Sequence, residues 1–157
     1  MDAMDSDAVK VRPASVADLD ALLPLVAQYQ AFYNATPEGD RNRQFFRRFI
    51  APSPEGLLLG AWDESHKALG FACIYWTHSS VSASDVALLN DLLVVPDRRS
   101  QGIGHRLVSD AITNAREHGC SQLRWQTAPD NHRAQRLYNQ FNAQHDAWLE
   151  YTITLTS

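Results

Sequence analysis

The stretch from Leu89 to Val108 constrains the fold of this chain more than any other part of its sequence. It begins with apolar residues typical of a buried strand and continues into a helix start that contains Gly102 and Gly104. The first amide groups of a helix have no acceptor within the helix and lie at the positive end of its dipole, so they can bind phosphate. The stretch therefore predicts a strand, a tight loop and a helix that together bind a polyphosphate ligand.

The spacing of the glycines argues against two common nucleotide-binding motifs. A dinucleotide-binding fingerprint needs a third glycine three residues after the second, and Leu107 stands at that position. A P-loop needs lysine and then serine or threonine after its last glycine, where this chain has His105 and Arg106. The remaining interpretations are a phosphate-binding loop of another kind and a glycine-rich turn without a ligand.

Arginines gather at this loop although the chain as a whole is acidic. The net charge is -4, yet Arg98, Arg99 and Arg106 all lie close to the two glycines in the sequence. Positive potential concentrated at one loop favours a small anionic ligand, and the acidic balance argues against nucleic acid as the main partner.

Length and composition indicate one globular domain. We expect a single domain over residues 1–157, because 157 residues are too few for two ordinary domains. Residues 1–8 are expected to form a flexible N-terminus. No segment approaches the roughly 18 apolar residues of a membrane span, and the N-terminus is acidic, unlike the basic start of a signal peptide. We therefore expect a cytoplasmic protein without a membrane partner.

The cysteines and histidines indicate neither a disulfide nor a metal site. Cys73 and Cys120 lie in unrelated segments, which favours two buried thiols over a bridge or a metal pair. The six histidines are scattered without the paired spacing of metal ligands.

Hydrophobic periodicity predicts an α/β (α+β) fold with the element order β-α-α-β-β-β-α-β-α-β. The strand, helix and strand over residues 85–127 imply a right-handed crossover between two parallel strands, within a mixed central sheet of about six to seven strands. We expect strands at residues 9–12, 57–62, 68–76, 85–95, 121–127 and 148–155, and helices that begin near Ser15, carry Phe45 to Ile50, and span 102–118 and 131–141.

A second motif follows the glycine loop and identifies a family. Asn131 and Ala134 open a predicted helix that also carries Tyr138. Taken with Arg99, Gly102 and Gly104 in this order, the motif resembles the GNAT superfamily of N-acetyltransferases, closest in pattern to its polyamine and small-amine members. The element order from residue 9 to residue 155 is also similar. The resemblance implies the GNAT acyl-CoA N-acyltransferase fold, acetyl-CoA as the acyl donor and no metal.

The resemblance also implies where acetyl-CoA binds. In that family two parallel strands splay apart, and the pantetheine arm lies against the strand that precedes the glycine loop. The pyrophosphate lies on the loop, and residues of the second motif contact the pantetheine side. Carried over to this chain, the cofactor-binding residues are Leu92, Leu93, Val94, Arg99, Ser100, Gln101, Gly102, Ile103, Gly104, His105, Asn131 and Tyr138.

Acetyl transfer to an amine needs a proton acceptor and a proton donor. An amine with a pKa of about 10.4 is protonated at pH 7, and removing that proton costs on the order of 4–5 kcal/mol. The resemblance implies that Tyr138 donates a proton to the departing thiolate. In relatives a carboxylate stands at the position of Asn90, and an asparagine cannot titrate. Asp91 is therefore the candidate that accepts the amine's proton or attracts its positive charge. The alternative for Asp91 is a structural role. His78 and His132 are fallback bases, and Cys73 or Cys120 as an acyl-carrying nucleophile is the dissenting mechanism.

The acceptor is expected to be a primary amine of a small molecule, polyamine-like or amino-acid-like, that attacks acetyl-CoA directly in a ternary complex. Aromatic faces and carboxylates suit such a cation. The alternatives are a protein lysine or N-terminal acetyltransferase and a catalytically silent acyl-CoA sensor. By resemblance we also expect a homodimer. The candidate substrate-binding residues are Tyr33, Glu38, Trp76, Asn90 and Asp91, with Tyr29, Phe32 and Tyr75 as further wall residues.

Overall fold

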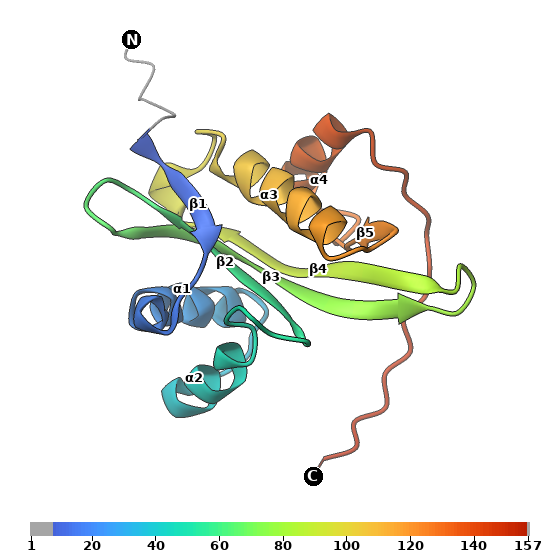
Figure 1. Ribbon diagram of the computed structural model, residues 1–157, viewed down its shortest axis with the longest axis horizontal. Coiled ribbons are helices and arrows are strands. Elements are labelled where there is room, and N and C mark those ends of the chain that lie inside the picture. Colours follow the sequence, from blue (N-terminus) through green and yellow to red (C-terminus); the bar gives the residue numbers. More distant parts are fainter. Residues whose placement is uncertain (1–7, 157) are drawn as a thin grey trace. The chain divides into compact units, whose positions relative to one another are not determined.

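A computed structural model of the chain describes residues 8–156 (Figure 1). Its contacts divide the chain into two compact units, Met1–Gln126 and Thr127–Ser157, and each is described by itself. The predicted flexible N-terminus, apart from Ala8, lies outside the described residues. Among the described residues, no helix is both long enough and apolar enough to cross a membrane.

The first unit is built on a five-stranded mixed sheet with the strand order β1-β2-β3-β4-β5. Neighbouring strands are antiparallel except for β4 and β5, which are parallel as predicted. The strands are β1 (Lys10–Pro13), β2 (Gly56–Trp62), β3 (Ala68–Ser79), β4 (Ser84–Val94) and β5 (Gln122–Arg124).

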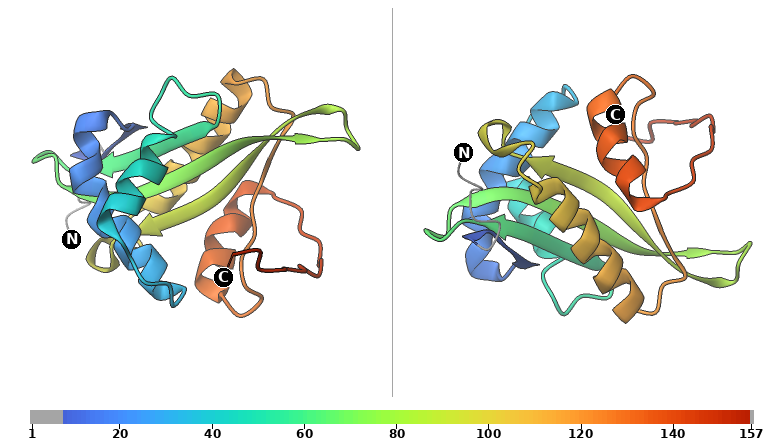
Figure 2. Two further views of the ribbon diagram at one scale, coloured as in Figure 1. Left: turned by 90° about the horizontal axis from the view of Figure 1, so that it is seen from below. Right: turned by 90° about the horizontal axis from the view of Figure 1, so that it is seen from above.

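Helices cover both faces of this sheet (Figures 1 and 2). The helices α1 (Leu19–Phe32) and α2 (Gly39–Arg47) lie on one face, and α3 (Ile103–Glu117) lies on the other. Leu22 and Phe71 are fully buried between α1 and the sheet, and Leu107 is fully buried beneath α3. Two short 3-10 helices, η2 (Val16–Asp18) and η3 (Pro96–Arg98), precede α1 and α3. The predicted α/β (α+β) class, with helices flanking a mixed central sheet, is confirmed.

The second unit contains one short helix and an extended tail. The helix α4 (His132–Tyr138) leads directly into the 3-10 helix η4 (Asn139–Phe141). Neither helix nor strand is present in the described residues after Asn142, and Leu149, Tyr151, Ile153 and Leu155 are all more than 80% exposed.

The predicted strand at residues 148–155 is therefore wrong for this structure, and the sheet has five strands rather than six to seven. The alternation of apolar residues is present in the sequence, but a strand forms only where a neighbouring strand accepts and donates its backbone hydrogen bonds. Among residues 127–156 the structure describes no second strand that could do so. The predicted strand at 121–127 is also shortened, to Gln122–Arg124.

Candidate functional site

A β-bulge interrupts β4 at Asn90. Across the ladder with β3, Cys73 pairs with Asp91 and Ile74 pairs with Leu89, so Asn90 is the extra residue on β4. A bulge bends its strand and redirects the side chains at that point. Here the side-chain amide of Asn90 donates hydrogen bonds to the Asp91 carboxylate at 3.0 Å and to the Tyr75 hydroxyl at 3.1 Å. The bulge thus places the successive side chains of Asn90 and Asp91 close to each other and to Tyr75.

A tyrosine from α1 completes this group. The Tyr29 hydroxyl donates to the backbone carbonyl of Asn90 at 3.3 Å, and its ring packs edge-on against Phe71 of β3 with the ring centroids 5.9 Å apart. We refer to Tyr29, Tyr75, Asn90 and Asp91 as the bulge cluster. Helix α1, strand β3 and strand β4 each supply part of it, so the sheet and the helix packed on it fix its geometry.

The carboxylate of Asp91 is held in an environment that disfavours its charge. The residue is only 6% exposed, and burial raises the pKa of Asp91 above its ordinary value, although hydrogen bonds from Tyr29 and Asn90 partly oppose that rise. Burial and the nearby negative charge of Asp91 also raise the pKa of both Tyr29 and Tyr75, so the two phenols stay protonated. A carboxylate with a raised pKa accepts a proton more readily at neutral pH than one in water.

One edge of β4 is open beside the cluster. The parallel pairing with β5 covers only Val86, Ala87 and Leu88. Among the strands that the structure describes, none pairs with this side of β4 from Leu89 onward. Leu92, Leu93 and Val94, the residues expected to face the pantetheine arm, lie in this open portion and remain predicted ligands.

The loop after β4 has the predicted form. It contains η3, then Ser100 with φ 61° and Gly102 with φ 83°, and Gly102 is the N-cap residue of α3. Nothing lies within 4 Å of the position that a Cβ of Gly102 would take, so the loop is open on that side. The Arg99 guanidinium donates to the Val94 carbonyl at 3.0 Å and ties the loop back to the strand. The strand, loop and helix are confirmed, and the phosphate ligand stays a prediction.

The rest of the predicted pyrophosphate site follows from this loop. Ile103, Gly104 and His105 occupy the first turn of α3, where backbone amides have no preceding acceptor within the helix. The side chain of Gln101 accepts a hydrogen bond from Arg98 at 2.8 Å, and this bond links two residues of the loop. The described residues contain no group of three or more histidine, cysteine, aspartate or glutamate side chains that could hold a metal ion.

The second motif lies in the second unit. Asn131 is the N-cap residue of α4, and its side-chain oxygen accepts from the Ala134 amide at 3.2 Å. Tyr138 is the last residue of that helix. The predicted helix start is confirmed, whereas contact of Asn131 and Tyr138 with acetyl-CoA stays a prediction.

Three further residues expected to bind substrate have different surroundings. The Tyr33 ring lies 5.0 Å from the Tyr29 ring, so it adjoins the bulge cluster. Glu38 forms an ion pair with Arg41 at 2.9 Å. Trp76 stacks on His118 with ring centroids 4.0 Å apart. The structure thus brings Tyr33, Asn90 and Asp91 together, and Trp76 lines a pocket that also includes Tyr75, while Glu38 has another partner.

The fallback bases also have defined positions. The Nδ1 atom of His78 lies 2.8 Å from the Asp85 carboxylate, and the His78 side chain is 82% exposed. His132 is the first residue of α4, in the second unit. Neither histidine has a part in the hydrogen bonds of the bulge cluster described above.

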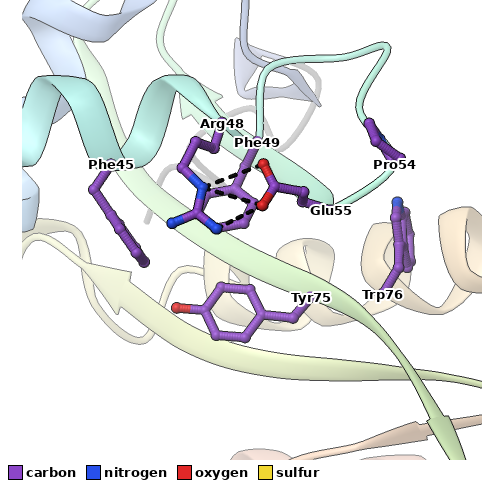
Figure 3. A pocket seen from close by; sticks show the side chains of 7 residues that line it. All are labelled: Phe45, Arg48, Phe49, Pro54, Glu55, Tyr75 and Trp76. Carbon is purple, nitrogen blue, oxygen red and sulfur yellow. Dashed lines mark hydrogen bonds and ion pairs between the residues drawn. The ribbon is translucent and has the colours of Figure 1, made fainter.

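A pocket of about 360 Å³ lies next to the bulge cluster (Figure 3). Tyr75 and Trp76, which were expected to line the acceptor site, are among its lining residues, whereas the others were not foreseen from the sequence. Two of its lining residues, Arg48 and Glu55, form a bidentate ion pair, with guanidinium-to-carboxylate distances of 2.5–3.2 Å. For Phe45 and Phe49 the sequence offered a partial signal, because the spacing of the aromatic residues in the second helix predicted a core-facing side but no pocket. The lining residues are Phe45, Arg48, Phe49, Pro54, Glu55, Tyr75 and Trp76.

Comparisons with known proteins converge on one family. Residues 25–143 match the model of the acetyltransferase (GNAT) family. The uncharacterized N-acetyltransferase YhfO of Bacillus subtilis is 33% identical over 148 residues, which cover 94% of this chain and 98% of YhfO. The D-amino-acid N-acetyltransferase HPA3 of Saccharomyces cerevisiae is 33% identical over 137 residues, which cover 86% of this chain and 84% of HPA3. The crystal structure of a probable acetyltransferase, 29% identical, superposes with a TM-score of 0.82 and covers 94% of this chain and 99% of its own.

Proposed function

This chain belongs to the GNAT family of N-acetyltransferases, and from that premise we propose that it acetylates a primary amine of a small molecule, polyamine-like or amino-acid-like. The observation that carries the proposal is the buried carboxylate of Asp91 at the bulge, beside an open strand edge. A relative with 33% identity is named for acetylating D-amino acids, which supports a small acceptor.

Acetyl-CoA, the acyl donor of this family, fits the open edge and the glycine loop. An extended amide-containing arm can hydrogen-bond to the backbone of Leu92, Leu93 and Val94, which lie beyond the pairing with β5. The loop from Ser100 to His105 offers amide groups at the start of α3, and the space beside Gly102 leaves room for a close approach of phosphate. Arg99, anchored on Val94, adds a fixed positive charge near that loop.

Asp91 is the proposed proton acceptor. The acceptor amine enters as an ammonium ion and must lose a proton before its nitrogen can attack the acetyl carbonyl carbon. Asp91 attracts that positive charge and takes the proton, directly or through a water molecule. Because the pKa of Asp91 is raised, the difference between it and the pKa of the amine is smaller. Proton transfer to Asp91 therefore costs less free energy than transfer to a carboxylate in water.

Tyr138 is the proposed proton donor. As the new C–N bond forms, the C–S bond of the thioester breaks and the sulfur leaves as a thiolate. The Tyr138 hydroxyl gives its proton to that sulfur. The nitrogen loses a second proton as it becomes an amide, and this proton, passed through solvent, restores the Tyr138 hydroxyl. The reaction then needs no covalent intermediate on the protein.

A panel of acceptors tests this function. Release of free CoA thiol would be followed with acetyl-CoA and polyamines, amino acids, aminoglycosides and lysine-containing peptides in turn. We expect turnover with at least one class of small amine. Turnover confined to peptides would replace the proposal by protein acetylation. Binding of acetyl-CoA in calorimetry with no turnover on any acceptor would replace it by an acyl-CoA sensor.

We further propose that the chain acts as one domain and assembles as a homodimer. The family match runs from residue 25 to residue 143 and so spans the boundary between the two units, which supports a single functional domain. The exposed apolar side chains of Leu149, Tyr151, Ile153 and Leu155 support burial of the tail against another surface. Sedimentation equilibrium of the full chain and of a chain ended at residue 147 tests the dimer, which the shortened chain should lose.

A further inference from the structure

We propose that the pocket between α2 and β3 binds the zwitterionic headgroup of the acceptor, and that the acceptor is a diamino acid acetylated on its distal amine. The inference rests on the proposed function and adds to it a substrate class and two specificity-determining residues, Arg48 and Glu55. Neither residue belongs to the bulge cluster or to the expected acetyl-CoA site.

The pocket combines aromatic walls with one pair of opposite charges (Figure 3). The Arg48 guanidinium lies over the ring of Phe45 at 5.2 Å and near that of Phe49 at 5.8 Å. Its Nε and one Nη atom donate to Glu55, and the side chains of Arg48 and Glu55 are 50% and 43% exposed. The pair is therefore held in place on one side and accessible to a ligand on the other.

Both members of the pair keep capacity for a second partner. A guanidinium has five N–H donors, and only its Nε and one Nη are engaged with Glu55. The Glu55 carboxylate likewise has lone pairs beyond those that Arg48 occupies. A carboxylate placed on Arg48 and an ammonium placed on Glu55 would give four alternating charges. The headgroup of a free amino acid carries these two charged groups on the same carbon atom.

Tyr75 connects this pocket to the reaction centre. Its ring stacks on Phe49 in the pocket wall, with centroids 5.1 Å apart and planes at 29°, while its hydroxyl accepts the hydrogen bond from Asn90. The side chain of Tyr75 thus belongs both to the pocket that holds the ion pair and to the bulge cluster. A run of methylene groups lying along this ring would bring a distal amine to Asn90 and Asp91.

The charges of the pocket also discriminate against simpler amines. A diamine without a carboxylate could place its second ammonium group on Glu55, but that cation would lie close to Arg48, whose remaining N–H donors would bind water instead of an anionic partner. A monoamine would leave the whole pocket empty. The expected order of preference is therefore diamino acid, then diamine, then monoamine.

The test compares acceptors that differ only in the headgroup. With the wild-type chain, kcat/KM would be measured for lysine and ornithine, for the carboxamide of lysine, and for the diamine with the lysine methylene chain. We expect the best diamino acid to exceed its carboxamide and the diamine by at least about tenfold, since a charge-assisted pair to arginine is lost in both. Mass spectrometry of the product should place the acetyl group on the distal nitrogen.

Variants then assign the preference to the ion pair. Arg48→Gln and Glu55→Gln should bring the kcat/KM ratio of diamino acid to diamine close to one, mainly through the KM of the diamino acid. Arg47→Gln is the matched control and should keep the ratio, because Arg47 is the last residue of α2, directly before Arg48, and does not line the pocket. The acceptor comparison on the wild-type chain decides the matter even if the variants fold poorly.

The outcomes separate this inference from the function it rests on. Turnover of diamines and diamino acids at equal kcat/KM, or acetylation of the α-nitrogen, would overturn the headgroup site and leave small-amine acetylation intact. Turnover on no small amine at all would remove the proposed function itself. Loss of the ratio in Arg47→Gln would show that the preference comes from the general charge of α2.

Discussion

Asp91 lies directly opposite Cys73 across the β3–β4 ladder, at the step where the register shifts. Cys73 is fully buried, and burial together with the negative charge of Asp91 raises the pKa of its thiol. The thiolate is the reactive form of cysteine, so this thiol is a poor nucleophile. The pairing thus favours direct attack by the amine over transfer through an acyl-cysteine.

The first prediction follows from that pairing. The double change Cys73→Ala and Cys120→Ala should leave kcat within about twofold of wild type, because the pKa of the Cys120 thiol is raised by burial as well. Loss of the buried Cys73 sulfur should lower the free energy of unfolding by about 1 kcal/mol. Steady-state release of CoA and thermal unfolding check the two halves. A folded double variant without turnover would contradict direct attack.

The second prediction concerns Asp91. Asp91→Asn keeps an acceptor for the hydrogen bonds from Tyr29 and Asn90 but removes the proton acceptor, so kcat should fall by about 100-fold or more. Affinity for acetyl-CoA, measured by calorimetry, should stay near that of wild type. An unchanged kcat would leave Asp91 with a structural role only.

The same substitution should alter how stability depends on pH. Because the pKa of Asp91 is raised in the folded state, the folded chain binds this proton more tightly than the unfolded chain does. Asp91 therefore contributes stability to wild type that is lost as pH rises from the ordinary value of 3.8 through the folded pKa, and Asp91→Asn lacks this contribution. Relative to wild type, the variant should gain Tm on going from acidic to neutral pH. A Tm difference between the two chains that is constant over this pH range would show that the pKa of Asp91 is not raised in the folded state.

The third prediction concerns Tyr138. Tyr138→Phe removes the proposed donor to the thiolate but keeps the ring, so kcat should drop by about 10²-fold or more while acetyl-CoA binds with similar affinity. Acceptors with more acidic amines do not restore a missing donor to sulfur, so they should show the same loss. An unchanged kcat would remove the acid role of Tyr138.

The fourth prediction concerns Gly102 in the loop after β4. Its φ of 83° is a conformation that a residue with a Cβ rarely adopts, although nothing lies within 4 Å of the Cβ position. Gly102→Ala should therefore cost about 1–2 kcal/mol of stability from the backbone alone. It should also raise the KM for acetyl-CoA, since the strained loop no longer holds its amides in place.

Gly39 provides the matched control for Gly102. It also has open space at its Cβ position, but it is the first residue of α2 and its φ is not in the left-handed region. Gly39→Ala should be neutral or stabilising by up to about 1 kcal/mol and should not change the KM for acetyl-CoA. Equal effects of the two substitutions would show that the backbone conformation of Gly102 is not what matters.

The sequence was most informative where a signal is local. The strand, loop and helix around Gly102 were predictable because apolar periodicity and glycine act within a few residues. The bulge at Asn90 was not, since it is a property of the register between two strands. Asp91 was singled out by resemblance, but its burial beneath Tyr29 depends on how α1 packs on the sheet.

Two other features show the limit of pattern reading. The alternation of apolar and polar residues at 148–155 is typical of a strand, but it does not show whether a second strand is available to pair with it. In the described tail neither strand is present. The pocket at Arg48 and Glu55 joins the end of α2 to the start of β2. Neither residue carries a motif, so only the packed structure could reveal that they meet.

The open edge of β4 has a consequence for the molecule before any ligand arrives. An unpaired strand edge is a template for the edge of another chain, and proteins usually protect such edges against aggregation. In this chain the bulge at Asn90 bends the strand at the point where the pairing with β5 has just ended. A straight strand from a second molecule would therefore fit this edge poorly, whereas a thin, flexible arm can follow the bend.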